Sequence, residues 1–72
     1  MRLDTIETGS KARVIRINRG ARAEQQLMEM GIVPGVEVEM LAKHLLRGPI
    51  IIKLGNMRIA LGRKLAGSIE VE

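Results

Sequence analysis

The clearest hydrophobic pattern lies in the middle of the chain, where a helical spacing of apolar side chains changes to a strand-like alternation. Ala23, Leu27 and Met30 recur at four- and three-residue intervals, which place them on one face of a helix. From Val36 to Met40, apolar residues instead alternate with two glutamates, which is typical of a strand with one buried face. The pattern therefore predicts a helix followed closely by a strand.

Two glycines and a proline mark the connection between this helix and this strand. Gly31 follows the last apolar helical position, and glycine readily adopts the left-handed conformation that commonly ends a helix. Ile32 then stands where a Schellman cap places an apolar residue against the helix, here against Leu27. Val33-Pro34-Gly35-Val36 predicts a type II turn, because proline fixes φ at the second position and glycine supplies a positive φ at the third.

A strand is also predicted from Lys11 to Asn18, although its pattern is uneven. Ala12 and Val14 fall on one face, whereas Ile15 and Ile17 fall on the other. Because strict alternation fails, we expect a β-bulge or strong curvature near Ile15, and small barrels need such bends. A strand buried on both faces would be the alternative, but the two arginines in this segment disfavour it.

The second half of the chain predicts a hairpin. Pro49 cannot donate to a sheet ladder, so it belongs at a strand start, and alternation follows from Ile50 to Leu54. Gly55-Asn56 is a strong two-residue turn signal, since both residues tolerate a positive φ. The return strand runs from Met57 to Leu61, with its odd-numbered residues on one face.

The two ends of the chain predict short elements. Asp4 is expected to cap a short turn, with Glu7 in the capping-box position and with Leu3 and Ile6 anchoring the segment. Near the C-terminus, the segment 62–67 is too short for a stable isolated helix and predicts one helical turn. A last short strand should follow, with Ile69 and Val71 facing inward.

Together these elements predict a mainly β fold, a small and strongly bent barrel of five strands with one helix and one short helical turn. The 72 residues make one domain, and its core must be aliphatic because the chain has no aromatic residue other than one histidine. Periodicity alone leaves an OB-like barrel open. The expected core is Val14, Leu27, Val36, Val38, Ile52, Ile59, Leu61, Ile69 and Val71.

Composition disfavours several classes of function. The absence of cysteine removes thiolate metal sites and cysteine nucleophiles, and His44, the single histidine, has no nearby carboxylate to orient it. We therefore expect no enzymatic activity and no cofactor. The formal charge of +4 is spread along the chain, but nucleic-acid binding is disfavoured because there are no rings on which bases could stack.

The sequence predicts neither a metal site nor insertion into a membrane. The outward-facing pairs Glu37/Glu39 and Glu70/Glu72 could offer carboxylate ligands, but we favour solvent-exposed glutamates that pair with arginine or lysine across the sheet. No metal site is therefore expected. No segment has the apolar length of a signal peptide or a transmembrane helix, so we expect a cytoplasmic protein without direct membrane insertion.

An interaction surface is the remaining candidate site. Leu45 and Leu46 are adjacent in a loop between strands, and His44 and Arg47 flank them. A small barrel has little room to bury both leucines, so one should be exposed within a charged rim, as in a docking element. The alternative is that the loop folds onto the barrel and buries both. Met28 lies off the apolar helical face and is a weaker candidate, and self-association stays open.

The segment Leu-Met-Glu-Met-Gly-Ile-Val-Pro-Gly-Val-Glu-Val, residues 27–38, resembles the L-x-x-x-G-[ILM]-x-x-G-x-x-[VI] core of the FeoA family, small cytosolic proteins of bacterial ferrous iron transport. The resemblance begins with Leu3, Gly9, Ala12, Val14 and Ile17 and continues through Gly48-Pro49-Ile50-Ile51-Ile52, Ile59-Ala60-Leu61 and Ala66-Gly67-Ser68-Ile69-Glu70-Val71. It therefore covers nearly the whole chain, and the order and spacing of the pieces make it fairly specific.

This resemblance implies an SH3-like barrel over residues 1–72, a single FeoA-like domain. It also implies a cytosolic adaptor that binds or regulates FeoB, the membrane ferrous iron transporter with a cytosolic G-protein domain. Alternatives are a stand-alone domain related to the C-terminal domain of metal-dependent repressors, or a weak nucleic-acid-binding barrel. The chain departs from many relatives after Leu61, where Gly62-Arg63-Lys64-Leu65 makes the turn more basic.

Overall fold

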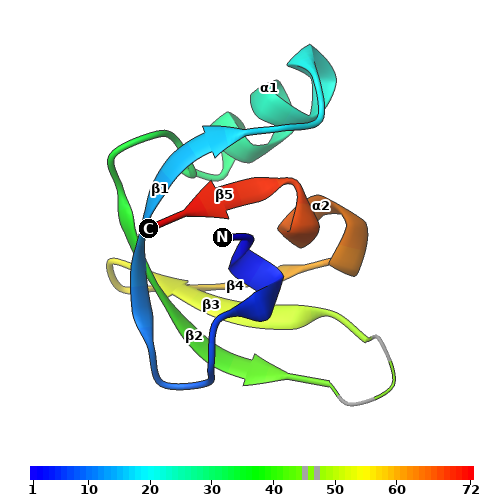
Figure 1. Cartoon of the computed structure of the whole chain (residues 1–72). Coiled ribbons are helices and arrows are strands. Elements are labelled where there is room, and N and C mark those ends of the chain that lie inside the picture. The colour runs from blue at the N-terminus through cyan, green and yellow to red at the C-terminus, as the bar shows by residue number, and fades with distance from the viewer. Residues whose placement is uncertain (45, 47) are drawn as a thin grey trace.

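The fold is described by a computed structural model that covers residues 1–44, 46 and 48–72. Within these residues, five strands, one 3₁₀ turn and two α-helices follow one another along the chain (Figure 1). In chain order they are η1 (Leu3–Thr5), β1 (Lys11–Ile17), α1 (Ala21–Glu29), β2 (Glu37–Lys43), β3 (Ile50–Leu54), β4 (Met57–Leu61), α2 (Arg63–Gly67) and β5 (Ile69–Val71). The described residues contain no helix that is both long and apolar enough to cross a membrane.

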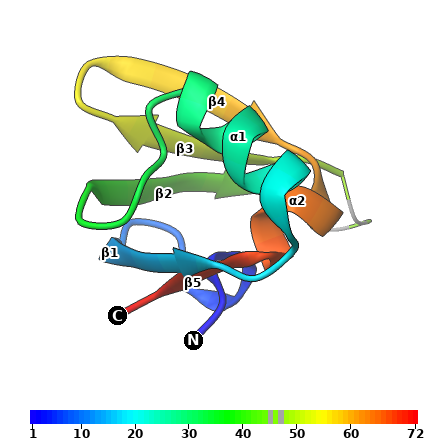
Figure 2. The ribbon, with the colours of Figure 1, turned by 90° about the horizontal axis from the view of Figure 1, so that it is seen from above.

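The strands form one antiparallel sheet in the order β4-β3-β2-β1-β5. The sheet curls strongly on itself, and α1 lies over one end of it (Figure 2). Part of the curl comes from two register shifts, one between Val14 and Arg16 on β1 and one between Met40 and Ala42 on β2. The expected bulge near Ile15 is therefore confirmed, and β2 carries a second bulge that the alternation of its residues had not suggested.

The predicted helix end and turn are confirmed in detail. Gly31 has φ +88 and donates its N–H to the Met28 carbonyl, while Ile32 donates to the Leu27 carbonyl, both at 2.9 Å. This pair of bonds is the Schellman arrangement. Gly35 has φ +100, and the Val36 N–H reaches the Val33 carbonyl at 3.2 Å, as a type II turn requires.

The core is aliphatic, as expected, and seven of its nine predicted members are buried. Val36 and Ile59 are only partly buried, because Val36 precedes β2 and Ile59 lies on the edge strand β4. Leu3 and Ile6 anchor the N-terminal segment in the core, as predicted. The core also contains Ala12, Ile17, Ala23, Ile32, Met40, Ile50 and Ala66.

The prediction for Asp4 is wrong. The residue at the N-cap of η1 is Arg2, which makes no side-chain cap, and Asp4 lies inside the turn. The Asp4 carboxylate instead accepts two hydrogen bonds from the Arg2 guanidinium, at 3.1 and 3.2 Å. The capping box fails because the turn begins two residues earlier than the side-chain pattern suggests.

The chain start also covers the outer edge of β5. The Val71 N–H donates to the Met1 carbonyl at 2.7 Å, and Arg2 forms a bridge with Glu70. This pairing leaves β4 as the uncovered edge strand of the sheet as described. It also brings the chain start and η1 beside α2 and β5 (Figure 1).

Candidate partner-binding surface

The connection from β2 to β3 contains most of the residues that the sequence suggested for partner binding. Leu46 is 94% exposed, which excludes the alternative that the barrel buries both leucines. His44 is also exposed. Leu45 and Arg47 lie outside the described residues. The surface therefore presents at least one large apolar side chain to a partner.

Arg63 of α2 donates hydrogen bonds to both ends of this connection. Its Nη2 donates to the His44 carbonyl at 2.7 Å, and its Nε donates to the Gly48 carbonyl at 3.0 Å. Gly48 also lies so close to His44 that a Cβ on Gly48 would stand 2.8 Å from the His44 Cβ. No local sequence signal could have revealed this role of Arg63, because the arginine and the loop meet only in the folded barrel.

Met28 is 56% exposed, as the sequence suggested, but it does not lie beside the loop. The end of α1 that carries Met28 leads into Gly31, whose position is close to the Leu54 side chain. Leu54 ends β3 and Ile50 begins it, so the helix end and the loop are roughly 13 Å apart along the strand. The structure therefore separates Met28 from the loop and does not combine the two into one surface.

Met57 is an exposed residue that sequence reasoning missed. The alternation places it on the same strand face as Ile59 and Leu61 of the expected core, yet its side chain is 53% exposed. It pairs with Leu54 next to the hairpin turn, where the sheet ends and no element covers the first residue of β4. Met57 is thus the second exposed methionine near this end of β3.

The outward-facing carboxylates do not gather into a metal site. Glu70 accepts hydrogen bonds from Asn18 at 2.9 Å and forms an ion pair with Arg16 at 2.7 Å, which confirms the expected cross-strand pairing for this residue. The Asn18 hydrogen bond, followed by the contacts with Arg16, lowers the pKa of Glu70. Across the described ranges, no group of three or more histidine, cysteine, aspartate or glutamate side chains could hold a metal ion.

Comparison with known proteins places this geometry in a family. Residues 1–72 match the FeoA domain. The chain is 38% identical over 64 residues to a putative Fe(2+) transport protein A of Methanocaldococcus jannaschii, covering 89% of this chain and 76% of that protein. It is 31% identical over all 72 residues to an Fe(2+) transport protein A/FeoB fusion protein of Porphyromonas gingivalis, of which the chain spans only 8%.

Solved structures agree in fold. A crystal structure of the iron uptake regulatory protein FeoA has a TM-score of 0.90 and 38% identity, covering 100% of this chain and 93% of that one. Stenotrophomonas maltophilia FeoA, described as an SH3 domain protein and crystallised with zinc, has a TM-score of 0.85 at 28% identity, covering 100% of this chain and 89% of that one.

A manganese-dependent transcriptional repressor has a TM-score of 0.89 at 22% identity, covering 99% of this chain and 40% of the repressor, which shows a shared fold alone. The match of the whole chain to the FeoA domain, and its identity to the transport protein A relative, show membership of a family as well as a shared fold. The barrel is SH3-like, and the chain belongs to the FeoA family of ferrous iron transport proteins.

Proposed function

We propose that this protein is an accessory protein of ferrous iron transport that binds or regulates a FeoB-type membrane transporter from the cytoplasmic side. The observation that supports this most directly is the fusion relative, in which a region similar to the entire chain is joined to FeoB. Joining two modules in one chain raises their effective concentration for one another, which is useful when the modules act together. Where the two modules are separate chains, they must meet through a docking surface.

The β2–β3 connection is the docking surface that we propose. Leu46 offers an apolar anchor, and His44 is an exposed polar neighbour of the kind found at interface rims. The two hydrogen bonds from Arg63 hold the ends of the loop, so less order has to be gained on binding. The partner would be the cytosolic G-protein domain of the transporter, and Met28 would make a separate, weaker contact.

The test measures, by calorimetry, binding of the purified protein to the cytosolic domain of a FeoB-type transporter from the same organism. Leu46→Glu should weaken the complex by roughly tenfold or more, because it removes an interface anchor and adds a charge. Its melting temperature should stay unchanged, since the side chain is exposed. Met57→Glu is the matched control for the loop, because it makes the same kind of change at an exposed residue at the opposite end of β3. Its position near the weaker Met28 contact predicts a smaller loss of affinity than Leu46→Glu causes.

Three results would contradict the proposal in separable ways. Absence of binding by the unmodified protein would reject the transporter as partner. Equal weakening by Leu46→Glu and Met57→Glu would point to a general effect of negative charge. Full affinity in a folded Leu46→Glu variant would remove this loop from the interface while leaving the partner in place.

A further inference from the structure

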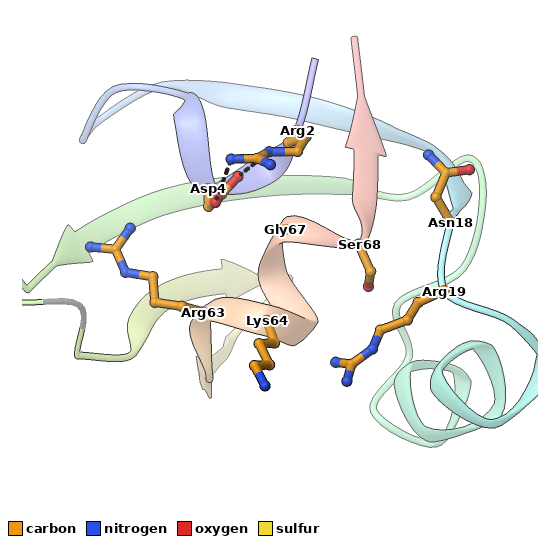
Figure 3. Close-up of a pocket in the computed structure, with 8 residues that line it drawn as sticks. All are labelled: Arg2, Asp4, Asn18, Arg19, Arg63, Lys64, Gly67 and Ser68. Atoms are coloured by element: carbon orange, nitrogen blue, oxygen red, sulfur yellow. Dashed lines mark hydrogen bonds and ion pairs between the residues drawn. The ribbon is translucent and has the colours of Figure 1, made fainter.

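A hollow of about 370 Å³ opens where the chain start, the β1–α1 connection and α2 meet (Figure 3). Arg2 and Asp4 enter it from η1 and its N-cap, Asn18 and Arg19 from the connection, and Arg63 and Lys64 from α2. A second hollow of about 200 Å³ shares Arg19 with the first and is further lined by Arg22, Ala23, Gln26 and Leu65. The two hollows share Arg19 and are both lined by residues of α2, so we treat them as one surface feature.

We call this feature the basic groove and define it by its five cationic residues, Arg2, Arg19, Arg22, Arg63 and Lys64. The chain has 12 basic and 8 acidic residues, and Asp4 is the one carboxylate in the groove. The rest of the sequence therefore holds seven basic and seven acidic residues and is formally neutral. The entire net charge of +4 lies in the groove, although the cations come from three separate segments.

Only part of this charge is already engaged. Asp4 neutralises Arg2 through two hydrogen bonds, and Arg63 donates to two backbone carbonyls of the β2–β3 connection. Within the described residues, Arg19, Arg22 and Lys64 make no side-chain hydrogen bond or ion pair. Arg19 and Lys64 extend toward the same side of the first hollow (Figure 3).

We infer that the basic groove binds an extended acidic segment of a partner protein. The unengaged cations are distributed along two hollows, so they match carboxylates spaced along a peptide better than the oxygens of one phosphate group, which need converging donors. Leu65 lines the second hollow and is only partly buried, so it offers apolar contact between the charges. The chain has no Phe, Tyr or Trp on which a nucleobase could stack.

This inference goes beyond the proposed docking loop, because it concerns a different surface and identifies its partner by charge alone. It stands whether or not the transporter is that partner. Attraction of an acidic segment to the groove would act chiefly on the association rate and on the choice of partner. It would also weaken with salt, since exposed charges are screened over about 10 Å at 0.1 M ionic strength.

The experiment follows backbone amide shifts by NMR while a short blocked peptide of alternating glutamate and leucine is added to the full chain. Shifts should concentrate at Arg19, Arg22, Lys64 and the residues beside them, and affinity should fall as sodium chloride rises. The double variant Arg19→Gln/Lys64→Gln should weaken binding roughly fivefold or more, as expected from two partly solvated charge contacts. The control Lys53→Gln/Arg58→Gln removes the same charge from two exposed residues that face each other on β3 and β4 and should leave affinity unchanged.

Every other outcome counts against the inference. Equal weakening by both double variants would mean general attraction to a basic protein, and shifts centred on another surface would place the acidic segment elsewhere. A peptide with glutamine in place of glutamate that binds equally well would remove the role of charge. Tighter binding of inorganic phosphate at the same amides would make the groove a phosphate site, and retention on vesicles with phosphatidylglycerol but no peptide shifts would make it a lipid-binding face.

Discussion

Gly31 gives the sharpest test of how this fold is stabilised, because its conformation and its surroundings both resist a side chain. Its φ of +88 lies in the region that L-residues rarely adopt, and a Cβ placed there would lie 3.2 Å from the Leu54 Cδ2. The left-handed conformation costs an L-residue about 1–2 kcal/mol. Replacing glycine also restricts the unfolded chain, which stabilises by about 0.4–1 kcal/mol and offsets part of that cost.

For Gly31→Ala these terms predict a net loss of about 1 kcal/mol, increased by whatever shift the Leu54 methyl has to make. Gly31→Val should lose more, since a β-branched side chain is stiffer and places further atoms toward Leu54. In a domain of this size, each 1 kcal/mol lowers the melting temperature by roughly 4–8 °C. Thermal and urea unfolding followed by circular dichroism would measure both variants.

Gly35→Ala separates the two causes. Gly35 also has a positive φ, +100, but a Cβ there would have no atom within 4 Å. It should therefore show the conformational penalty alone, and Gly31→Ala should be the more destabilised of the two. If Gly31→Ala unfolds at the same temperature as the unmodified protein, the Schellman cap does not hold the helix end, and the reasoning fails.

Three further predictions concern the core, acid stability and metal. Leu27→Ala should lose about 2–5 kcal/mol of unfolding free energy in urea, because Leu27 is fully buried; a loss below 1 kcal/mol would contradict its place in the core. Because the pKa of Glu70 is lowered in the fold, its carboxylate stabilises the folded state at pH values above the ordinary pKa of glutamate. This stabilisation is lost as the pH falls through the lowered pKa. Glu70→Gln should flatten the acid side of the stability curve measured by denaturation at several pH values, and an unchanged acid side would contradict this role of Glu70. Chelator should leave the circular dichroism spectrum unchanged, because the described carboxylates and His44 do not converge; unfolding in chelator would make His44 a ligand candidate.

The parts of the fold that the sequence predicts are those decided by local chemistry. Pro34 fixes its own φ, and Gly31 and Gly35 permit the positive φ that other residues rarely adopt, so the helix end and the turn follow from a few residues. The predicted hairpin is confirmed for the same reason, with Leu54 pairing with Met57 across the two-residue turn. Even the bulge in β1 leaves a local trace, since alternation breaks at Ile15.

Errors occur where a residue's environment depends on which element ends beside it. Asp4 has the sequence context of a cap, but the turn starts at Leu3, so its carboxylate pairs with Arg2 instead. Met57 alternates in step with Ile59 and Leu61, which predicts the same strand face for all three. It is nevertheless exposed, because it is the first residue of an edge strand. The alternation of side chains along a strand predicts which face of the sheet each residue lies on. Whether that face is covered depends on the neighbouring elements.

The basic groove is an extreme case of the same limit. Along the sequence, Arg13, Arg16, Arg19 and Arg22 recur at every third residue, but the structure divides them among β1, the β1–α1 connection and α1, so the repeat forms no continuous basic face. Arg13 is bonded to the Gly35 carbonyl and Arg16 is paired with Glu70. Arg19 lines one hollow together with Arg2 of the chain start, 17 residues earlier, and with Arg63 and Lys64 of α2, more than forty residues further along. Arg22 lines the adjoining hollow. A concentration of charge that depends on closure of the barrel has no periodic signature in the sequence. The net charge gathers on one surface because, in the folded barrel, β5 pairs with both β1 and the chain start and so brings the three basic segments together.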